Sequence, residues 1–498
     1  MKHFGFRSFK FPQWCLPEMT TDYSSASFGR VSVLDCASPL ALSKAAEGRR
    51  SPRPDGRFIV PALFVAIFFA YAASASETNG IQSLSLAEAH ELALKNHPQI
   101  AAADYRTLAA EQVVKEARSG FFPTANLYGT AAGADSQNTR IMAGGLNNPS
   151  VFDRAAEGLG LSQLITDFGR TANLTASSKL QAQAANHNAA ATREQVLLQV
   201  DANYFGVLQA QAVLNVARQT LATRQLLLDQ VSVLASNKYK SELDVSFAQV
   251  ALGEGRLLVQ RAGSDADAAR ASLSTALGFH ELRTFQPVEQ SLPLAAATND
   301  VSDLIETALR DRPELASLRN EHDAELRFAR AQRDARYPAI AAVGAVGNSL
   351  IHDDRLPDNY AAGGIQLSMP LFAGGLYAAR QHEAELRARA DAEILRAAED
   401  NVIRDVRIAW LNLNNAVERL RITAQLVHHA AEAYSLAEAL YQVGSSSIVE
   451  LSQAQLALTS AQIADTNARY DVLMQQVNLT YQTGGILRSE GLVVYSQK

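Results

Sequence analysis

Cysteine is almost absent from this chain of 498 residues: it has two, Cys15 and Cys36, and both precede residue 58. The remaining residues hold no thiol, so they can form neither a disulfide nor a thiolate metal site. This absence excludes disulfide-stapled secreted domains and cysteine-based catalysis for that part of the chain. No G-x-S-x-G run and no cluster of metal-ligating residues takes their place, so an enzyme is not expected.

Long apolar runs are also scarce, and one stands out near the N-terminus. FIVPALFVAIFFAYA, residues 58–72, follows four arginines and precedes Ala-Ser-Ala at 73–75. These are the parts of a secretory signal, and the run is short for a membrane span. We therefore expect residues 1–75 to be an N-terminal extension and signal peptide, with residues 1–57 arising from a start codon placed too far upstream. No cysteine directly follows the run, so no lipid anchor is expected.

Beyond residue 75 the sequence has no further run of eighteen apolar residues. No helix is therefore expected to span a bilayer, and entry into a membrane would require a β-barrel. Residues 1–75 hold nine of the 45 Lys and Arg and five of the 51 Asp and Glu, which leaves the rest with a net charge of −10. This acidic balance excludes nucleic acid as an expected partner.

What the chain does have is an internal repeat of about two hundred residues. ALKNHPQI at 93–100 matches ALRDRPEL at a spacing of 215 residues, and positions from Ser162 to Gly278 match at a spacing of 206. The spacing changes once, by nine residues, between these stretches. We expect one two-copy body with a first repeat at 76–300 and a second at 301–498.

Each copy shows the pattern of a helix, a strand hairpin, a long helix, a turn and a returning helix. Pro98 and Pro313 are expected to kink or restart the first helix of each copy. The expected strands are 121–133, 157–167, 338–348 and 360–371. The expected long helices are 169–235, 241–280, 375–441 and 447–483.

Two periodicities support these elements. The long helices lack proline for about 65 residues, a length of roughly 100 Å, and carry a shared seven-residue apolar series typical of a coiled coil. That series is Val200, Val207, Leu214, Leu221 and Leu228, aligned with Val406, Leu413, Leu420, Val427 and Tyr434. The expected strand 360–371 alternates, with one apolar side at Ala361, Gly363, Ile365, Leu367, Met369 and Leu371. Two copies give four strands, too few to close a barrel, whereas three chains would give twelve.

Several short sequences mark these elements. The first copy carries SLAEAHELALKNHPQI, the strand start FFP and the turn ITDFGR, and the second carries the strand start YP, the turn LFAGGL and the tip sequence YQVGSSSIVELSQAQ. Over nearly all of residues 81–485 the chain resembles the TolC family of outer-membrane efflux proteins. The resemblance implies a mainly α fold with a transmembrane β-barrel: a homotrimer with one twelve-stranded barrel, four strands per chain, and a long periplasmic coiled-coil α-barrel.

The resemblance also implies a function and partners. It implies an outer-membrane channel, in contact with outer membrane lipid, that exports drugs, metals or secreted proteins for a tripartite efflux pump or a type I secretion system. The partners would be a periplasmic adaptor (membrane fusion) protein and an inner-membrane pump, with no cofactor. The alternative is a periplasmic coiled-coil adaptor or scaffold without a pore, although adaptors carry compact β-domains that this sequence lacks. The exported substrate, the pump family and the resting state of the gate stay open.

The resemblance places a gate at the periplasmic tip of the helices. Tyr441 and Gly444 match the family's second tip motif, Glu450 occupies a position that carries an acid, and Asp244 is its equivalent in the first copy. Either acid can equally serve as a favourable charge at a helix N-terminus, and the two roles can coexist. Tyr441 falls on the seven-residue series, so burial and a latch are both open.

Two tip residues depart from the family pattern. Ser446 stands where the best-known member has an arginine, and Gln453 replaces a second acid. The ion-pair lock of that member is therefore not expected, and a weaker acidic ring remains.

Two further groups of residues have simpler interpretations. Asp167, Gly169, Gly374 and Gly375 lie at the strand-to-helix turns, where glycine lets the chain change direction. His428 and His429 are adjacent on a helix, so they are not expected to face one metal ion together, and no ligand is expected four residues away. No metal site is therefore predicted.

Overall fold

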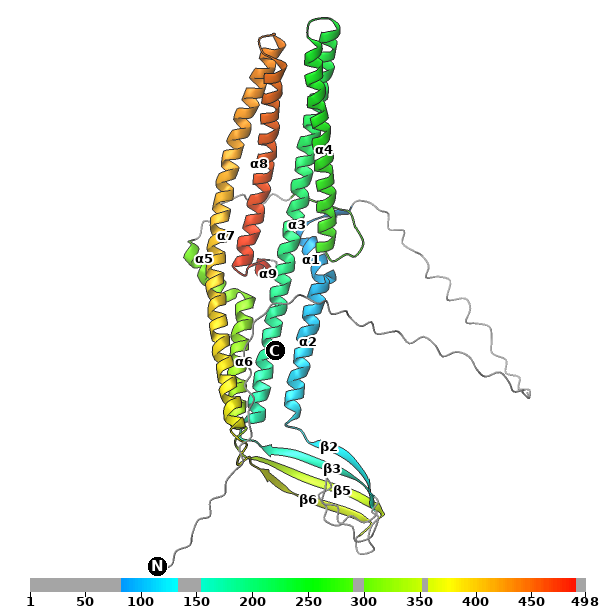
Figure 1. Cartoon of the computed structure of the whole chain (residues 1–498), viewed down its shortest axis with the longest axis vertical. Helices are drawn as coiled ribbons and strands as arrows, with labels where there is room; N and C mark the ends of the chain where they lie inside the picture. Colours follow the sequence, from blue (N-terminus) through cyan, green and yellow to red (C-terminus); the bar gives the residue numbers. More distant parts are fainter. Residues whose placement is uncertain (1–81, 133–153, 290–299, 352–356, 490–498) are drawn as a thin grey trace, which may run out of the picture. The chain divides into compact units, whose positions relative to one another are not determined.

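Two pairs of long antiparallel helices and a four-stranded sheet are the largest elements of the described part of the chain (Figure 1). The computed structural model describes residues 82–132, 154–289, 300–351 and 357–489. These residues belong to one unit, Glu77–Lys498, which holds both copies. The expected signal peptide and extension, residues 1–75, lie outside the described residues.

The main helices and strands follow the same order in each copy, whereas among the described residues two short strands belong to the first copy alone and one short helix to the second alone. The first copy contains β1 (Gln82–Leu84), α1 (Leu86–Asn96), α2 (Pro98–Ser119), β2 (Thr124–Ala132), β3 (Arg154–Thr166), α3 (Arg170–Ser236), α4 (Glu242–Ala276) and β4 (Phe285–Pro287). The second contains α5 (Val301–Asp311), α6 (Pro313–Asp334), β5 (Ala339–Ile351), β6 (Asn359–Ser368), α7 (Leu376–Gln442), α8 (Ile448–Gln482) and α9 (Ile486–Ser489). The long helices α3 and α7 have 67 residues each, and the returning helices α4 and α8 have 35 each.

Proline breaks the first helix of each copy, as predicted. His97 ends α1 in an extended conformation and also caps α2, which begins at Pro98. Arg312 does the same between α5 and α6, which begins at Pro313. A proline at the first helical position loses no hydrogen bond, because that N–H has no partner within the helix.

A short strand precedes the first helix, which begins at Leu86. Leu84 belongs to β1, which pairs in parallel with β4 from the far end of the copy. The helix begins after Ser85, whose hydroxyl accepts from the backbone N–H of Glu88 while the Glu88 carboxylate accepts from the N–H of Ser85. This capping box satisfies two backbone donors and fixes the boundary.

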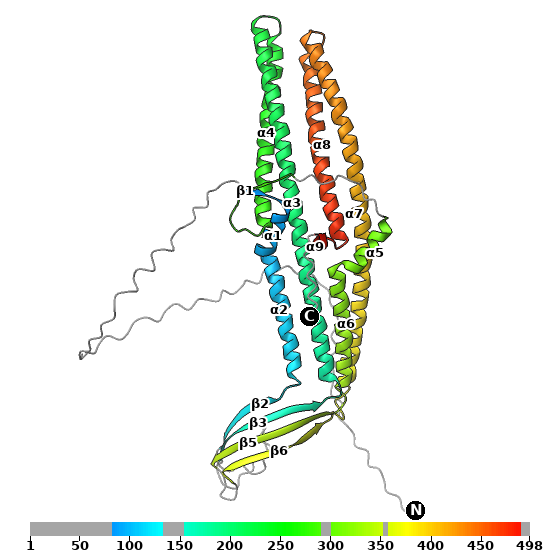
Figure 2. The ribbon, with the colours of Figure 1, turned by 180° about the vertical axis from the view of Figure 1, so that it is seen from behind.

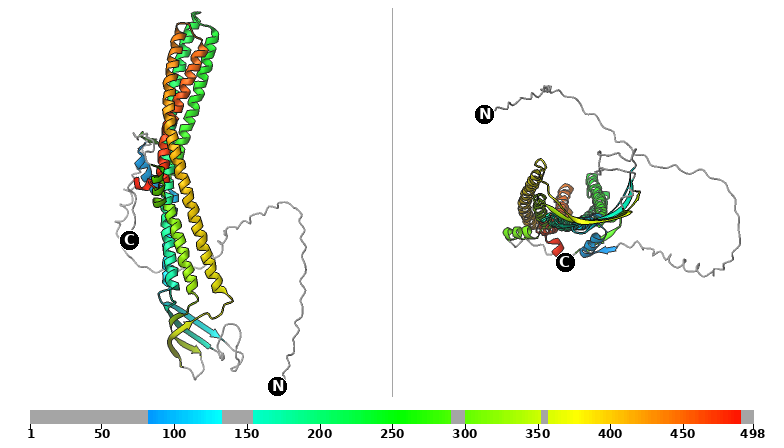
Figure 3. Two further views of the ribbon diagram at one scale, coloured as in Figure 1. Left: turned by 90° about the vertical axis from the view of Figure 1, so that its left-hand side faces the viewer. Right: turned by 90° about the horizontal axis from the view of Figure 1, so that it is seen from below.

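The four hairpin strands form one antiparallel sheet in the order β2-β3-β5-β6, and the sheet is curved (Figure 3). One paired row carries Leu127, Leu159, Val346 and Ala361, so these side chains share a face. Leu127 is 81% exposed and Val346 49% exposed. One face of the sheet therefore carries exposed apolar side chains in this chain, and β2 and β6 are its two edges.

The last strand is shorter than predicted. β6 ends at Ser368, so Met369 and Leu371 fall outside it. Pro370 lies between them and has no N–H to donate to a neighbouring strand, which ends the ladder. Ile365 and Leu367, earlier in the predicted series, are on the strand and exposed.

The helices pack as two hairpins, α3 with α4 and α7 with α8, whose turns lie at the same end (Figures 1 and 2). The α3 helix also contacts α2, α6 and α8, so it joins the two copies. The largest apolar cluster surrounds Tyr204, which is fully buried and whose hydroxyl lies 3.0 Å from the Leu84 carbonyl and 2.7 Å from the Val288 carbonyl. None of the described helices has an eighteen-residue stretch apolar enough to cross a membrane.

The predicted seven-residue series is buried in its first part only. Val200, Val207 and Leu214 are buried, whereas Leu221 and Leu228 are half-buried. Toward the tip α3 faces the second copy, so other positions become buried. The Thr220 hydroxyl lies 3.3 Å from that of Thr459 in α8, and Val231 packs against residues of α7 and α8.

Candidate gate at the helical tips

The two tip turns use the same backbone geometry with different residues. Gly444 has φ +79° and Lys238, at the aligned position of the first copy, has φ +60°. Glycine adopts this left-handed conformation freely, whereas another residue pays about 1–2 kcal/mol for it. The first-copy turn is therefore the more strained of the two.

The two acids predicted for the gate complete capping boxes. The Ser241 hydroxyl accepts from the Asp244 N–H at 3.2 Å, and the Asp244 carboxylate accepts from the Ser241 N–H at 3.1 Å. Ser447 and Glu450 repeat the arrangement at 3.3 and 3.4 Å. Both acids are thus held at the N-terminus of a returning helix, which is the simpler of the two interpretations offered by the sequence.

The serine that departs from the family pattern contacts one of these acids. The Ser446 hydroxyl donates to the Glu450 carboxylate, and this bond, followed by the one from the Ser447 N–H, lowers the pKa of Glu450. The carboxylate is therefore charged at neutral pH. Gln453 lies exposed one turn further along α8, outside this group.

Tyr441 packs between the two copies. It is 5% exposed and belongs to an apolar cluster with Val231 of α3 and Ile448 and Leu451 of α8. Its hydroxyl has no hydrogen-bond partner among the described residues. Burial raises the pKa of Tyr441, and the charge of Asp244 raises it further. The ring, not the hydroxyl, makes the contact.

A lysine that the sequence did not single out joins this contact. The Nζ atom of Lys240 lies 4.0 Å from the centroid of the Tyr441 ring. A cation over an aromatic face is attracted by the ring quadrupole. Lys240 lies in the polar turn of the first copy, and nothing in its local sequence indicated a partner two hundred residues away.

The strand-to-helix turns also use left-handed residues. Gly169 and Gly375 are the N-cap residues of α3 and α7, with φ +108° and +82°, and Gly374 has φ +57°. In the first copy Asp167 reinforces the turn: its carboxylate accepts from the Gly169 N–H at 3.2 Å and from the N–H and hydroxyl of Thr171 at 2.7 and 2.5 Å.

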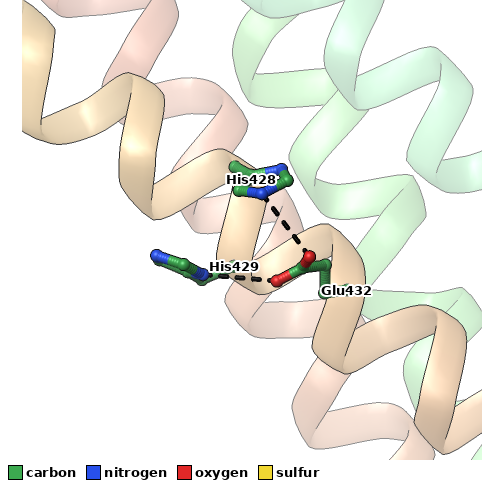
Figure 4. A group of neighbouring side chains, drawn as sticks. All are labelled: His428, His429 and Glu432. Atoms are coloured by element: carbon green, nitrogen blue, oxygen red, sulfur yellow. Dashed lines mark hydrogen bonds and ion pairs between the residues drawn. The ribbon is translucent and has the colours of Figure 1, made fainter.

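The histidine pair on α7 contradicts one sequence-based argument. A ligand four residues from His428 is present, because Glu432 lies next to both imidazoles (Figure 4). His428 Nε2 is 3.4 Å from Glu432 Oε1, and His429 Nδ1 is 3.3 Å from Glu432 Oε2. Residues 428 and 432 are about one helical turn apart, so their side chains lie on the same face of the helix.

Both copies match the sequence model of a known protein family. The sequence model of a family described as outer membrane efflux protein matches residues 89–279 and 304–485, one stretch in each copy. The chain belongs to this family. Membership confirms the predicted TolC-family resemblance, the non-enzymatic transport function and the outer-membrane location with a helical periplasmic part.

Individual outer membrane efflux proteins show the same relationship. The chain is 26% identical over 431 residues to the outer membrane protein TolC of Vibrio cholerae serotype O1, covering 84% of this chain and 94% of TolC. It is 24% identical over 413 residues to the alkaline protease secretion protein AprF of Pseudomonas aeruginosa, covering 81% and 85%. The solved outer-membrane channel OprN matches with a TM-score of 0.69 at 19% identity, over 80% of this chain and 90% of OprN. At that identity OprN shows the shared fold, mainly helical with tandem repeats.

Proposed function

We propose that three copies of this chain form one export channel, with a twelve-stranded barrel in the outer membrane and a helical tunnel in the periplasm. The observation that carries this proposal is the four-stranded sheet with two open edges, β2 and β6. Unpaired strand edges are satisfied when β6 of one chain pairs with β2 of the next. Three such sheets supply the twelve strands of a closed wall.

The outward apolar face of the sheet supports contact with outer membrane lipid. A barrel in a bilayer needs an apolar outer surface, and Leu127, Ile365 and Leu367 are 81%, 76% and 63% exposed in the single chain. The opposite face would line the channel.

An exposed apolar stripe on α4 supports the trimer in the helical part. Leu243, Phe247, Val250 and Leu257 recur at intervals of four, three and seven residues, the spacing of a coiled-coil seam. They are 64%, 41%, 61% and 56% exposed in the single chain. A neighbouring copy would cover them and close the tunnel wall.

The partners we propose are a periplasmic adaptor protein and an inner-membrane pump, which deliver the substrate to the tunnel. The relative AprF is named for alkaline protease secretion, and other relatives are named for solvent and toluene efflux. We propose that the cargo is a drug, a metal or a secreted protein; the names of these relatives support secreted proteins and small organic molecules. We also propose that residues 1–75 are removed on export and that 76–300 and 301–498 are the two repeats of the mature chain.

We propose that the tips form the gate. Glu450 and Asp244 would line an acidic ring, and Tyr441 would hold the two copies of each chain together in the closed state. Gly444, Ser446 and Gln453 would shape the second tip. The residues Asp167, Gly169, Gly374 and Gly375 would fix the junction between barrel and tunnel.

The trimer is tested by counting chains. Sedimentation of the detergent-extracted outer-membrane fraction, with the density of the detergent matched by the solvent, should give the mass of three chains. A particle of one chain would leave the strand edges unpaired and would favour the scaffold without a pore.

The acidic ring is tested by separating charge from capping. Glu450→Gln keeps a side chain that can complete a capping box but removes the charge. Block of single channels by multivalent cations should weaken, and Glu450→Ala should also raise the conductance. Unchanged block in Glu450→Gln would remove Glu450 from the pore lining while leaving the trimer intact. Asp244→Asn is the matched variant in the first copy.

A further inference from the structure

Three polar side chains on α7 lie close together, and they have no role in the proposed channel. His428, His429 and Glu432 are 68%, 74% and 57% exposed. Their potential ligand atoms all lie within 4.8 Å of one another, and no other such group of three occurs among the described residues. Each imidazole faces a different oxygen of the Glu432 carboxylate (Figure 4).

The separations suit a small divalent cation. A tetrahedral zinc ion binds nitrogen and oxygen at about 2.0–2.2 Å, which places neighbouring donor atoms roughly 3.3–3.5 Å apart. Each imidazole has a nitrogen at this distance from one oxygen of the Glu432 carboxylate: His428 Nε2 lies 3.4 Å from Oε1 and His429 Nδ1 lies 3.3 Å from Oε2. One ligand atom from each of the three residues lies within 4.8 Å of the other two, so binding of one ion requires the exposed side chains to rotate toward each other.

The repeat shows that the architecture does not require this group. The positions of the first copy at the 206-residue spacing are Ala222, Thr223 and Leu226, none of which offers a nitrogen or carboxylate ligand. The two long helices nevertheless have the same length and the same place in their hairpins. An exposed ion pair would stabilise α7 very little, so stability does not explain the convergence.

We propose that His428, His429 and Glu432 bind one divalent transition-metal ion of the zinc class. Imidazole nitrogen and carboxylate oxygen are common zinc ligands, and the i to i+4 and i to i+3 spacings bring Glu432 next to each of the two histidines. Three protein donors leave a fourth position for water or for a donor from another molecule. The site is independent of the proposed gate and of the number of chains.

The test is a metal-ion titration of the full chain in detergent. The protein is purified with an affinity tag that contains no histidine, so that the tag itself binds no metal. Isothermal calorimetry with Zn²⁺ should show one ion per chain, and Co²⁺ should give the visible absorption of a low-symmetry site. His428→Ala and Glu432→Gln should each weaken binding by at least about tenfold, because each removes one of three ligands.

The matched control lies on the same helix. His382 is an exposed histidine whose Nδ1 lies 3.8 Å from Glu385, so this pair offers two donor side chains in place of three. His382→Ala should leave the zinc affinity unchanged. The proposal is overturned by an absence of saturable binding, by binding that survives in the double variant His428→Ala/Glu432→Gln, or by equal weakening in His382→Ala. Sedimentation of the same particles gives the number of chains, so a failure of the zinc proposal can be distinguished from a failure of the proposed trimer.

Discussion

Replacement of Tyr441 distinguishes a packing anchor from a hydrogen-bonded latch at the tip. The hydroxyl of this residue is buried and has no partner among the described residues. A buried hydroxyl without a partner costs about 1–3 kcal/mol, so Tyr441→Phe should leave the closed state unchanged or stabilise it slightly. Tyr441→Ala removes the ring itself, and this should open the gate.

The size of the second effect follows from the neighbours of the ring. Deleting a buried aromatic ring costs about 3–5 kcal/mol. Ile448 and Leu451 lie on the same hairpin as Tyr441 and would stay in contact after the copies separate, whereas Val231 and Lys240 would not. If half of the loss is specific to the closed state, about 2 kcal/mol remains. This corresponds to a roughly thirtyfold shift toward the open state in each chain.

The assay is single-channel recording in planar bilayers. Wild type and Tyr441→Phe should show the same low conductance, and Tyr441→Ala a higher one. Lys240→Met removes only the cation over the ring, worth about 0.5–1 kcal/mol, and should have a small effect. Equal opening by Tyr441→Phe and Tyr441→Ala would show that the hydroxyl makes the contact, and unchanged conductance in Tyr441→Ala would show that the ring does not hold the gate.

Three further changes test the fold and the tip. Tyr204→Phe removes the hydroxyl that contacts the Leu84 and Val288 carbonyls and should lower the free energy of unfolding by about 1–3 kcal/mol; an unchanged urea midpoint would contradict the role of these bonds. Gly278→Ala should cost about 2–4 kcal/mol in the same assay, because Gly278 has φ +84° and an added Cβ would lie 2.8 Å from the backbone of the α1–α2 junction. Hydrogen bonds lower the pKa of Glu450, so its stabilising effect is present above the ordinary value of 4.5 and is lost as the pH falls through the lowered value. The protection factors of the amides in the first turn of α8, corrected for the intrinsic pH dependence of exchange, should therefore fall in acid, and Glu450→Gln should abolish that change.

Features of the fold that depend on local sequence could be predicted from it. Pro98 and Pro313 restart their helices because proline lacks an N–H, whatever its surroundings. Glycine at 169 and 375 takes up the left-handed backbone that the strand-to-helix turns need. The repeat itself followed from matching residues, since two similar sequences form similar units.

Features that depend on distant contacts could not be predicted in this way. The short strands β1 and β4 have three residues each and pair across two hundred positions, which gives no periodic signal. The contact between Lys240 and Tyr441 joins the two copies, and no pattern within one copy indicates it. The proximity of Glu432 to His428, in contrast, could have been predicted, because the two residues are four positions apart on one helix.

The equal lengths of the long helices restrict how this chain can change. A single deletion in α3 would lower one tip by about 1.5 Å and rotate all residues beyond it by about 100°. The tips contact each other through Tyr441, so α3, α4, α7 and α8 can shorten or lengthen only in concert and in whole heptads. The single change of spacing between the copies, nine residues, falls in the strand hairpins, where no such matching is needed. Over evolution, insertions and deletions are therefore expected to accumulate in the strand hairpins, whereas the helical tips are expected to change by amino-acid substitution alone.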